Sequence, residues 1–417
     1  MRKIISQLGP GLLFASMSIG TSHLVLSTKA GAQYGWIMIF PILLANVLKY
    51  PFFEFGIRYT HTFKKSLLEG YADLGKKYLW AYTLITIVSA LTLLAALYIV
   101  TAGLLKQLFS WAHFTDTTVA LFLFIGISGV LIIGRYKALE GVVKILLALL
   151  TVALIITTAT VLLKGPIENA PQFTSQPIWS EVGLLFMIGL MGWMPTAVEA
   201  SSWVSLWRLE KDKKNQKDKN TSTNNSLKDT LAEFNLGYLL TAVLAIFFLV
   251  IGWFTLYGSG IEMSANASVF AEQLIQMFTI HIGDWSYFFI ALAAFATMFS
   301  TCMTAHDAIA RVGLDTIKVL GNNKTTKWRY EHFIILLAII NFMVIWLAGG
   351  QMGSLVALAT FVSFVFAPAV GLLNHKVVTQ KNMPKDAMAP KWLILLSYVG
   401  MVFLSLFALY YCYVVLL

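Results

Sequence analysis

Long apolar stretches separated by short polar ones run along the whole chain. Many of them reach the roughly 20 residues that a helix needs to cross the hydrocarbon core of a bilayer. The pattern predicts an all-α membrane protein in which eleven helices cross the membrane. Their approximate ranges are 9–32, 35–57, 78–106, 116–134, 144–164, 178–204, 233–257, 285–310, 331–348, 352–374 and 391–416.

Two of these stretches are interrupted near their middle. Gly20-Thr21-Ser22-His23 breaks the first, and Gly192-Trp193-Met194-Pro195 breaks the sixth. A break in hydrocarbon frees backbone N–H and C=O groups, and this is tolerated only where the break is buried in protein or lines a watery cavity. Paired breaks of this kind predict a binding site at the membrane midplane of a secondary transporter.

Composition excludes a soluble protein and several other classes. The chain is 58% hydrophobic and only 12% charged, with a mean hydropathy of +0.75. The net charge of +10 is explained by basic loops facing the cytoplasm, so no nucleic-acid partner is expected. Cys302 and Cys412 lie in apolar surroundings, which favours buried thiols over a disulfide. No nucleophile–base pair or phosphate-binding loop appears, so neither an enzyme nor a cofactor is expected.

The basic residues alternate between loops in a way that predicts the topology. With the N-terminus in the cytoplasm, the outer loops 165–177 and 258–284 contain no Lys or Arg. Cytoplasmic loops attract positive charge, so we expect a cytoplasmic N-terminus and an outer C-terminus in a prokaryotic plasma membrane. The predicted cytoplasmic loops contain Arg58 to Lys77, Arg135 and Lys137, Arg208 to Lys228, Arg311 to Arg329, and Lys376 to Lys391.

A basic, Asn-rich linker divides the chain into two halves. We expect residues 211–226, within the loop 208–230, to remain solvated. Residues 1–165 would then hold helices 1–5, residues 178–374 would hold helices 6–10, and 391–417 would add an eleventh. The breaks fall in the first helix of each half, as in an inverted repeat.

Several motifs resemble the NRAMP family of divalent metal transporters. They are Gly9-Pro10-Gly11-Leu12-Leu13, Ala30-Gly31-Ala32-Gln33-Tyr34-Gly35, Lys49-Tyr50 with Glu54 and Arg58, and Met194-Pro195. The resemblance implies the LeuT-type fold, a 5+5 inverted repeat, here with one extra helix and with broken helices 1 and 6.

The likeness fails at the family's metal site. Where the family carries a metal-binding Asp and Asn at the first break, this chain has Gly20 and His23. Thr196 and Ala197 follow Met194-Pro195 in place of the family's His and Asn. The third span also lacks the family's acidic residues, and the ninth its arginine. A changed cargo is therefore expected.

A small anion is the predicted cargo, with bicarbonate as the best single candidate. The half-helix that begins near Ser22 presents free N–H groups and the positive end of its dipole to an anion. Lys29 would add a fixed positive charge, unless it extends to the outer surface. The predicted substrate-binding residues are Gly20, Thr21, Ser22, His23, Met194, Pro195 and Thr196.

A divalent cation is the competing cargo. Mg²⁺ or Mn²⁺ would use Met194, His23 and Glu199, with Glu199 supplying the carboxylate. In the anion hypothesis Glu199 and Lys29 serve instead as gating or electrostatic residues. A sensor or channel on the same scaffold is a further possibility, which the paired breaks and the lack of a soluble domain disfavour.

Hydroxyl groups on the eighth span predict a coupling-ion site. Hydroxyl and carbonyl oxygens suit Na⁺, although Ser and Thr also hydrogen-bond between helices without any ion. The candidate residues are Thr297, Ser300, Thr301 and Thr304. The sequence thus predicts a monomeric, bilayer-embedded transporter that takes up a small inorganic ion with Na⁺ by alternating access.

Overall fold

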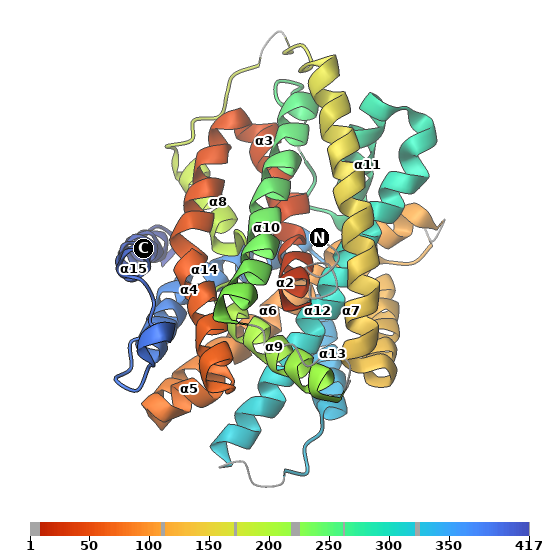
Figure 1. The fold of residues 1–417 in the computed structure, drawn as a ribbon. Coiled ribbons are helices and arrows are strands. Elements are labelled where there is room, and N and C mark those ends of the chain that lie inside the picture. The colour runs from red at the N-terminus through yellow and green to blue at the C-terminus, as the bar shows by residue number, and fades with distance from the viewer. Residues whose placement is uncertain are drawn as a thin grey trace.

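The computed structural model describes residues 9–109, 113–170, 173–217, 226–261, 263–321 and 326–416. Across these ranges the chain forms fourteen α-helices and no strand, which confirms the all-α prediction (Figure 1). Nine helices in this part of the chain are long and apolar enough to cross a membrane. The count of eleven crossings stays a prediction.

The first predicted span consists of short helical pieces. It contains α2 (Pro10–Ser18), the π-helix η1 (Ser22–Ser27) and α3 (Thr28–Tyr34). Pro10 suits the first turn of α2, where its missing N–H costs no hydrogen bond. Gly35, at a φ of 72° that favours glycine, ends α3 and turns the chain through the 3₁₀ helix η2 (Gly35–Met38) into α4 (Ile39–Phe63).

The rest of the first half differs from the sequence prediction at one point. A capping box of Ser66 and Glu69 starts the short helix α5 (Leu67–Leu74), and α6 (Lys76–Leu108) follows. Two apolar stretches of membrane length, Asp116–Gly134 and Leu139–Lys164, match predicted spans four and five, but the segment between them is helical rather than an irregular loop. Helical backbone hydrogen bonding continues through it, so α7 (Asp116–Lys164) is one helical element.

The second half also contains more helix than expected. The predicted outer loop 258–284 includes α11, and the predicted solvated linker begins inside α9; residues 218–225 of that linker lie outside the described part. The elements are α8 (Glu181–Trp193), α9 (Ala200–Lys217), α10 (Leu227–Leu256), α11 (Ala267–Ile282), η3 (Asp284–Ser286), α12 (Tyr287–Leu320), α13 (Tyr330–Leu347), α14 (Met352–Val378), η4 (Lys385–Ala387) and α15 (Lys391–Leu416).

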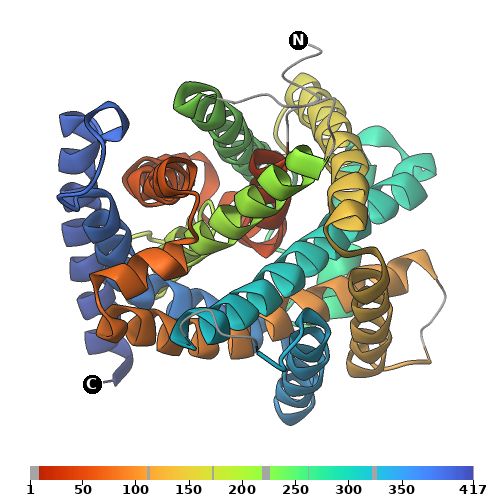
Figure 2. The same cartoon turned by 60° about the horizontal axis from the view of Figure 1, so that its bottom comes forward.

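The pieces of the first span lie among the other helices rather than at their edge (Figure 2). α10 packs along α2, η1 and α3, while α12 and α9 also contact α2. Glycines allow this close approach: a Cβ on Gly11 would lie 2.5 Å from the Glu233 carbonyl oxygen, and one on Gly31 only 2.0 Å from that of Leu249. Small residues at helix crossings are typical of membrane bundles.

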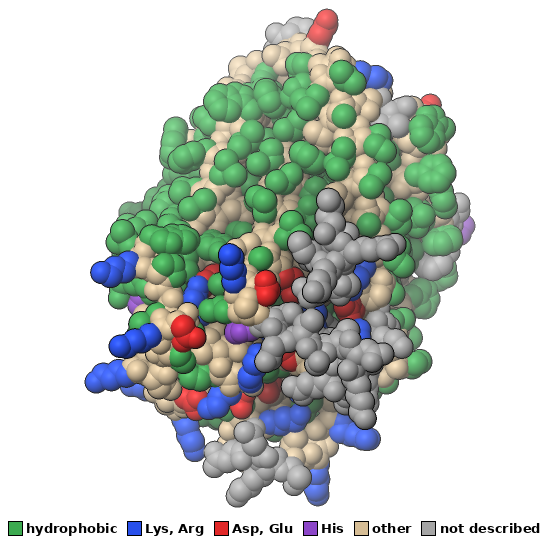
Figure 3. All heavy atoms as spheres, viewed as in Figure 1, with side chains coloured by type: hydrophobic (Ala, Val, Ile, Leu, Met, Phe, Trp, Pro, Cys, Tyr) green, Lys and Arg blue, Asp and Glu red, His purple; other side chains and the backbone are tan. Residues whose placement is uncertain are grey.

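Charged side chains gather at one end of the molecule, which we call the basic end (Figure 3). Its exposed lysines include Lys64, Lys65 and Lys213. The remaining surface in this view is mainly apolar, as expected for a surface that faces lipid. The basic end corresponds to the predicted cytoplasmic side, and the orientation itself remains a prediction.

Candidate functional site: a cavity between two helix interruptions

The first interruption lies between Ser18, the last residue of α2, and Ser22, the first residue of η1. Helical bonding resumes at once, because the N–H of Leu24 donates to the Gly20 carbonyl at 2.9 Å. A Cβ on Gly20 would lie 2.6 Å from Cγ2 of Thr301 on α12. Thr301 therefore occupies the space that a larger side chain would need, which accounts for glycine at this position.

The second interruption lies between α8 and α9, and the side chain of Lys49 stabilises it. Residues 194–199 are outside both helices. The buried ammonium group of Lys49, on α4, donates to the carbonyl oxygens of Met191 at 2.6 Å, Gly192 at 2.7 Å and Thr196 at 3.4 Å. A cation at the carbonyl end of a helix satisfies the carbonyls left without partners and complements the helix dipole.

A small cavity lies between the two interruptions. Its volume of about 20 Å³ is enough for one water molecule or one bare ion. The buried Ser18 hydroxyl and Trp203 indole N–H have no hydrogen-bond partner among the described residues, so both are available to cargo. The lining contains no charged side chain and consists of Met17, Ser18, Thr21, Ser22, Leu93, Leu97, Trp193, Thr196, Trp203, Thr301 and Ala305.

Three of the seven predicted substrate-binding residues line this cavity: Thr21, Ser22 and Thr196. Gly20, Met194 and Pro195 do not. His23 faces α10 instead, because its Nε2 lies 2.9 Å from the Thr241 carbonyl oxygen and its Nδ1 lies 2.7 Å from Ser22 Oγ. Both ring nitrogens thus contact protein groups, and His23 does not line the cavity, contrary to its predicted place in the substrate site.

The predicted metal ligands are not gathered around one ion. His23 is bonded elsewhere, Met194 is buried outside the cavity lining, and Glu199 follows Thr196 by three residues without lining the cavity. Throughout the described ranges, no three His, Cys, Asp or Glu side chains lie close enough to hold a metal. The polar side chains of the cavity lining are those of Ser, Thr and Trp residues.

Oxygen atoms of α2 and α12 converge beside the first interruption. Thr301 Oγ1 lies 2.9 Å from the Ser16 carbonyl oxygen, 3.3 Å from that of Ile19 and 3.1 Å from that of Thr297. Ser300 Oγ lies 2.8 Å from the Thr297 carbonyl oxygen. We call these five oxygens the oxygen cluster. Thr304, the fourth predicted residue, bonds back to the carbonyls of its own helix.

Lys29 lies away from the cavity, near α11. Its ammonium group is 3.5 Å from the Ser264 carbonyl oxygen and 5.5 Å from the centre of the Phe270 ring. It therefore joins α3 to α11 and to the loop before it. Lys29 does not line the cavity, so it does not contact cargo held there.

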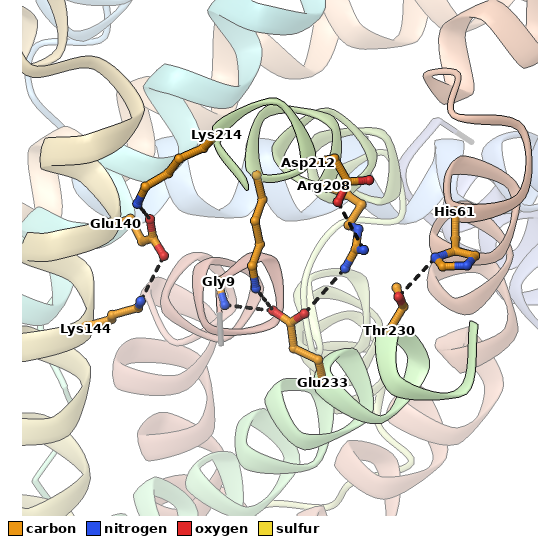
Figure 4. Close-up of polar contacts among 10 residues, drawn as sticks. Gly9, His61, Glu140, Lys144, Arg208, Asp212, Lys214, Thr230 and Glu233 are labelled. Carbon is orange, nitrogen blue, oxygen red and sulfur yellow. Dashed lines mark hydrogen bonds and ion pairs between the residues drawn. The ribbon is translucent and has the colours of Figure 1, made fainter. Parts of the chain in front are cut away.

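A buried ionic network joins α2, α9 and α10 at the basic end (Figure 4). One Glu233 oxygen accepts from the Gly9 N–H at 2.7 Å and from Lys211 at 3.1 Å, while the other lies 3.7 Å from Arg208. Arg208 also pairs with Asp212 at 3.1 Å. Burial lowers the pKa of Lys211, and the Glu233 carboxylate opposes that shift. We call these five residues the basic-end network.

Near this network, Glu140 on α7 forms two ion pairs, one of which links α7 to α9. Glu140 accepts from Lys144 and from Lys214, each at 2.8 Å (Figure 4). Sequence reasoning missed both groups, because it placed Lys211 and Lys214 in a solvated linker. The sequence does contain one sign of these groups: charged residues follow the sixth apolar stretch without a break, as they would on a helix that continues beyond it.

The fold and the cavity between paired helix interruptions define a membrane transporter of the LeuT-type architecture. The family described as natural resistance-associated macrophage protein-like (Nramp) matches residues 11–414. The chain belongs to this family, which consists of membrane transporters and not enzymes. An uncharacterised protein of Pasteurella multocida is 32% identical over 406 residues, which cover 96% of this chain and 90% of that protein.

Solved structures with the same fold are much more distant in sequence. The Eremococcus coleocola manganese transporter, in complex with an aromatic bis-isothiourea substituted compound, superimposes with a TM-score of 0.74 at 13% identity. That comparison covers 98% of this chain and 86% of the other. MhsT in complex with L-phenylalanine gives a TM-score of 0.65 at 15% identity, covering 95% of this chain and 98% of the other. These likenesses concern the fold.

Proposed function

We propose that the protein is a secondary transporter that carries a small metal cation by alternating access through the cavity. The observation that carries the proposal is the position of the cavity between two interrupted helices, with room for a single ion. Membership of the Nramp family supports a metal cargo, as does the manganese transporter that shares the fold. This cargo replaces bicarbonate as the leading candidate.

The lining favours Mg²⁺ over Mn²⁺. Hydroxyl groups of Thr21, Ser22 and Thr196 are hard ligands and outnumber the single soft thioether of the lining, that of Met17, while Met194 and His23 do not line the cavity. The volume is too small for a fully hydrated ion, so cargo in this cavity would have lost most of its water. We expect Mg²⁺ to be carried, with Mn²⁺ as a competitor.

A small anion remains the second candidate because of one observation, the absence of a charged side chain from the cavity lining. A dication in such a cavity has no adjacent carboxylate, whereas bicarbonate could use the Ser18 hydroxyl and the indole N–H of Trp203 as donors. Uptake measurements separate the two cargoes directly.

The oxygen cluster supports Na⁺ as the coupling ion. The Thr301 hydroxyl lies within hydrogen-bond distance of three carbonyl oxygens, and the Ser300 hydroxyl within that distance of one of them. The two hydroxyl groups would rotate their protons outward on binding, leaving five oxygens to face the ion. A bound Na⁺ would join α2 to α12 and so couple its own release to movement of the first helix.

Uptake into proteoliposomes tests this function. The protein should accumulate Mg²⁺ or Mn²⁺, faster when Na⁺ is supplied on the same side, and Thr196→Val should slow uptake because it removes a cavity hydroxyl. Thr174→Val, at an exposed position in the loop before α8, is the matched control. Sodium-driven accumulation of radiolabelled bicarbonate without cation uptake would replace the cation with the anion.

A further inference from the structure

Glu199 is a buried acid without a hydrogen-bond partner. Its side chain is 0% exposed, and neither carboxylate oxygen bonds to any described residue. It follows Thr196, which lines the cavity, by three residues. An unpaired carboxylate in a dry interior is strongly disfavoured, and a buried acid takes up a proton instead. Acids inside membrane bundles mark proton and ion routes more often than structural contacts.

The groups around Glu199 do not supply the missing hydrogen bonds. Lys49, the cation whose field reaches the carboxyl group, directs its ammonium protons to the carbonyl oxygens of Met191, Gly192 and Thr196. Tyr82, the neighbouring titratable group on α6, donates to the backbone oxygen of Glu199 and not to its side chain. Ser89 lies beside the carboxyl group. Ser89 and the charge of Lys49 favour the charged form, but burial, the larger effect, disfavours it.

A cation in the cavity lacks a negative counter-charge, and an ionised Glu199 lacks a positive one within hydrogen-bond distance among the described residues. A cation in the cavity has no charged side chain in contact with it, and Glu199 is the acid nearest in sequence to the lining residue Thr196. When a cation enters, a negative charge on Glu199 compensates part of its field. The same field makes it easier for the carboxyl group to lose its proton.

We propose that Glu199 holds a proton until a cation binds in the cavity and releases it on binding. The O–H bond of the carboxyl group breaks, the proton passes to water, and the carboxylate remains as the counter-charge. This inference rests on the proposed cation cargo. It makes the transporter's cation affinity dependent on pH, through a residue outside the cavity lining.

Proton release on cation binding is the direct test. The purified full-length protein is titrated with Mg²⁺ and with Mn²⁺ in weakly buffered solution containing a pH indicator. We expect about one proton per bound ion, and an affinity that rises by up to tenfold per pH unit where Glu199 is protonated in the empty protein. Glu199→Gln should bind the ion without releasing a proton, and its affinity should not depend on pH.

Two further variants keep the test decisive. Glu181→Gln removes an exposed acid at the start of α8 and should behave as the wild type does. Glu199→Asp keeps the titratable group, so it should retain proton release even if Glu199→Gln fails to fold, which thermal unfolding would reveal. Cation binding by the wild type without proton release, or release that persists in a folded Glu199→Gln, overturns the proposal. If no version binds a cation, the proposed cargo fails and the proton site fails with it.

Discussion

Removing the charge of Glu233 should open the basic end of the transporter. The Glu233→Gln variant keeps a side-chain oxygen that can accept from the Gly9 N–H. It leaves two buried cations, Lys211 and Arg208, with a single acid in the network, Asp212. Breaking a buried ion pair by removing one partner costs about 3–5 kcal/mol. The conformation with both cations buried bears this cost, and we expect a conformation that admits water to the basic end to bear less of it.

The expected shift toward the open conformation is therefore large. At about 1.4 kcal/mol for each factor of ten, the population ratio changes by roughly 10² to 10³ or more. A reporter cysteine, Ser18→Cys, would measure the shift, because Ser18 lines the cavity and is only 1% exposed. Replacing Cys302 with Ala and Cys412 with Ser removes the native thiols.

The assay is labelling by a membrane-impermeant thiol reagent applied from the basic end. Asp73→Asn is the control, since the Asp73–Lys65 pair lies at the same end but is 45% exposed on both sides. Exposed pairs contribute about 0–1 kcal/mol, so this variant should label nearly as slowly as the parent. Equal labelling rates in Glu233→Gln and Asp73→Asn would refute the role of the basic-end network.

Three other predictions follow from single contacts. Thr301→Val combined with Ser300→Ala should abolish stimulation by Na⁺ in the uptake assay, because the oxygen cluster loses both hydroxyls; unchanged stimulation would exclude this site. Lys49→Met should lower the free energy of unfolding by about 3–5 kcal/mol, since it leaves helix carbonyls buried without donors. Thermal unfolding in detergent measures the loss, and an unaltered midpoint would contradict the capping role of Lys49. Gly20→Ala should destabilise the protein by about 1–3 kcal/mol by overlapping Thr301, and a combined Thr301→Ser change should restore part of that stability.

The apolar pattern predicted the helical class and most of the helix positions, because a helix in lipid needs a long uninterrupted apolar run. It could not predict α11, which lies in a stretch of mixed polarity, or the continuity of α7 through its basic residues. Both depend on backbone hydrogen bonds and neighbouring helices rather than on local composition.

The site was predicted in outline but not in orientation. Polar residues at the breaks identified Thr21, Ser22 and Thr196, which line the cavity. The direction of the His23 ring depends on the Thr241 carbonyl oxygen, 218 residues away in sequence. The role of Lys49 depends in the same way on carbonyls of α8, which no side-chain motif records.

The position of the bound cation tests the central claim most directly. Crystals of the full-length protein soaked in Mn²⁺ give an anomalous signal that locates the ion. The account predicts one peak in the cavity, within coordination distance of the Thr21 and Thr196 hydroxyl groups, and its loss after competition with excess Mg²⁺. An empty cavity in crystals of a protein that still takes up Mn²⁺ would contradict the account.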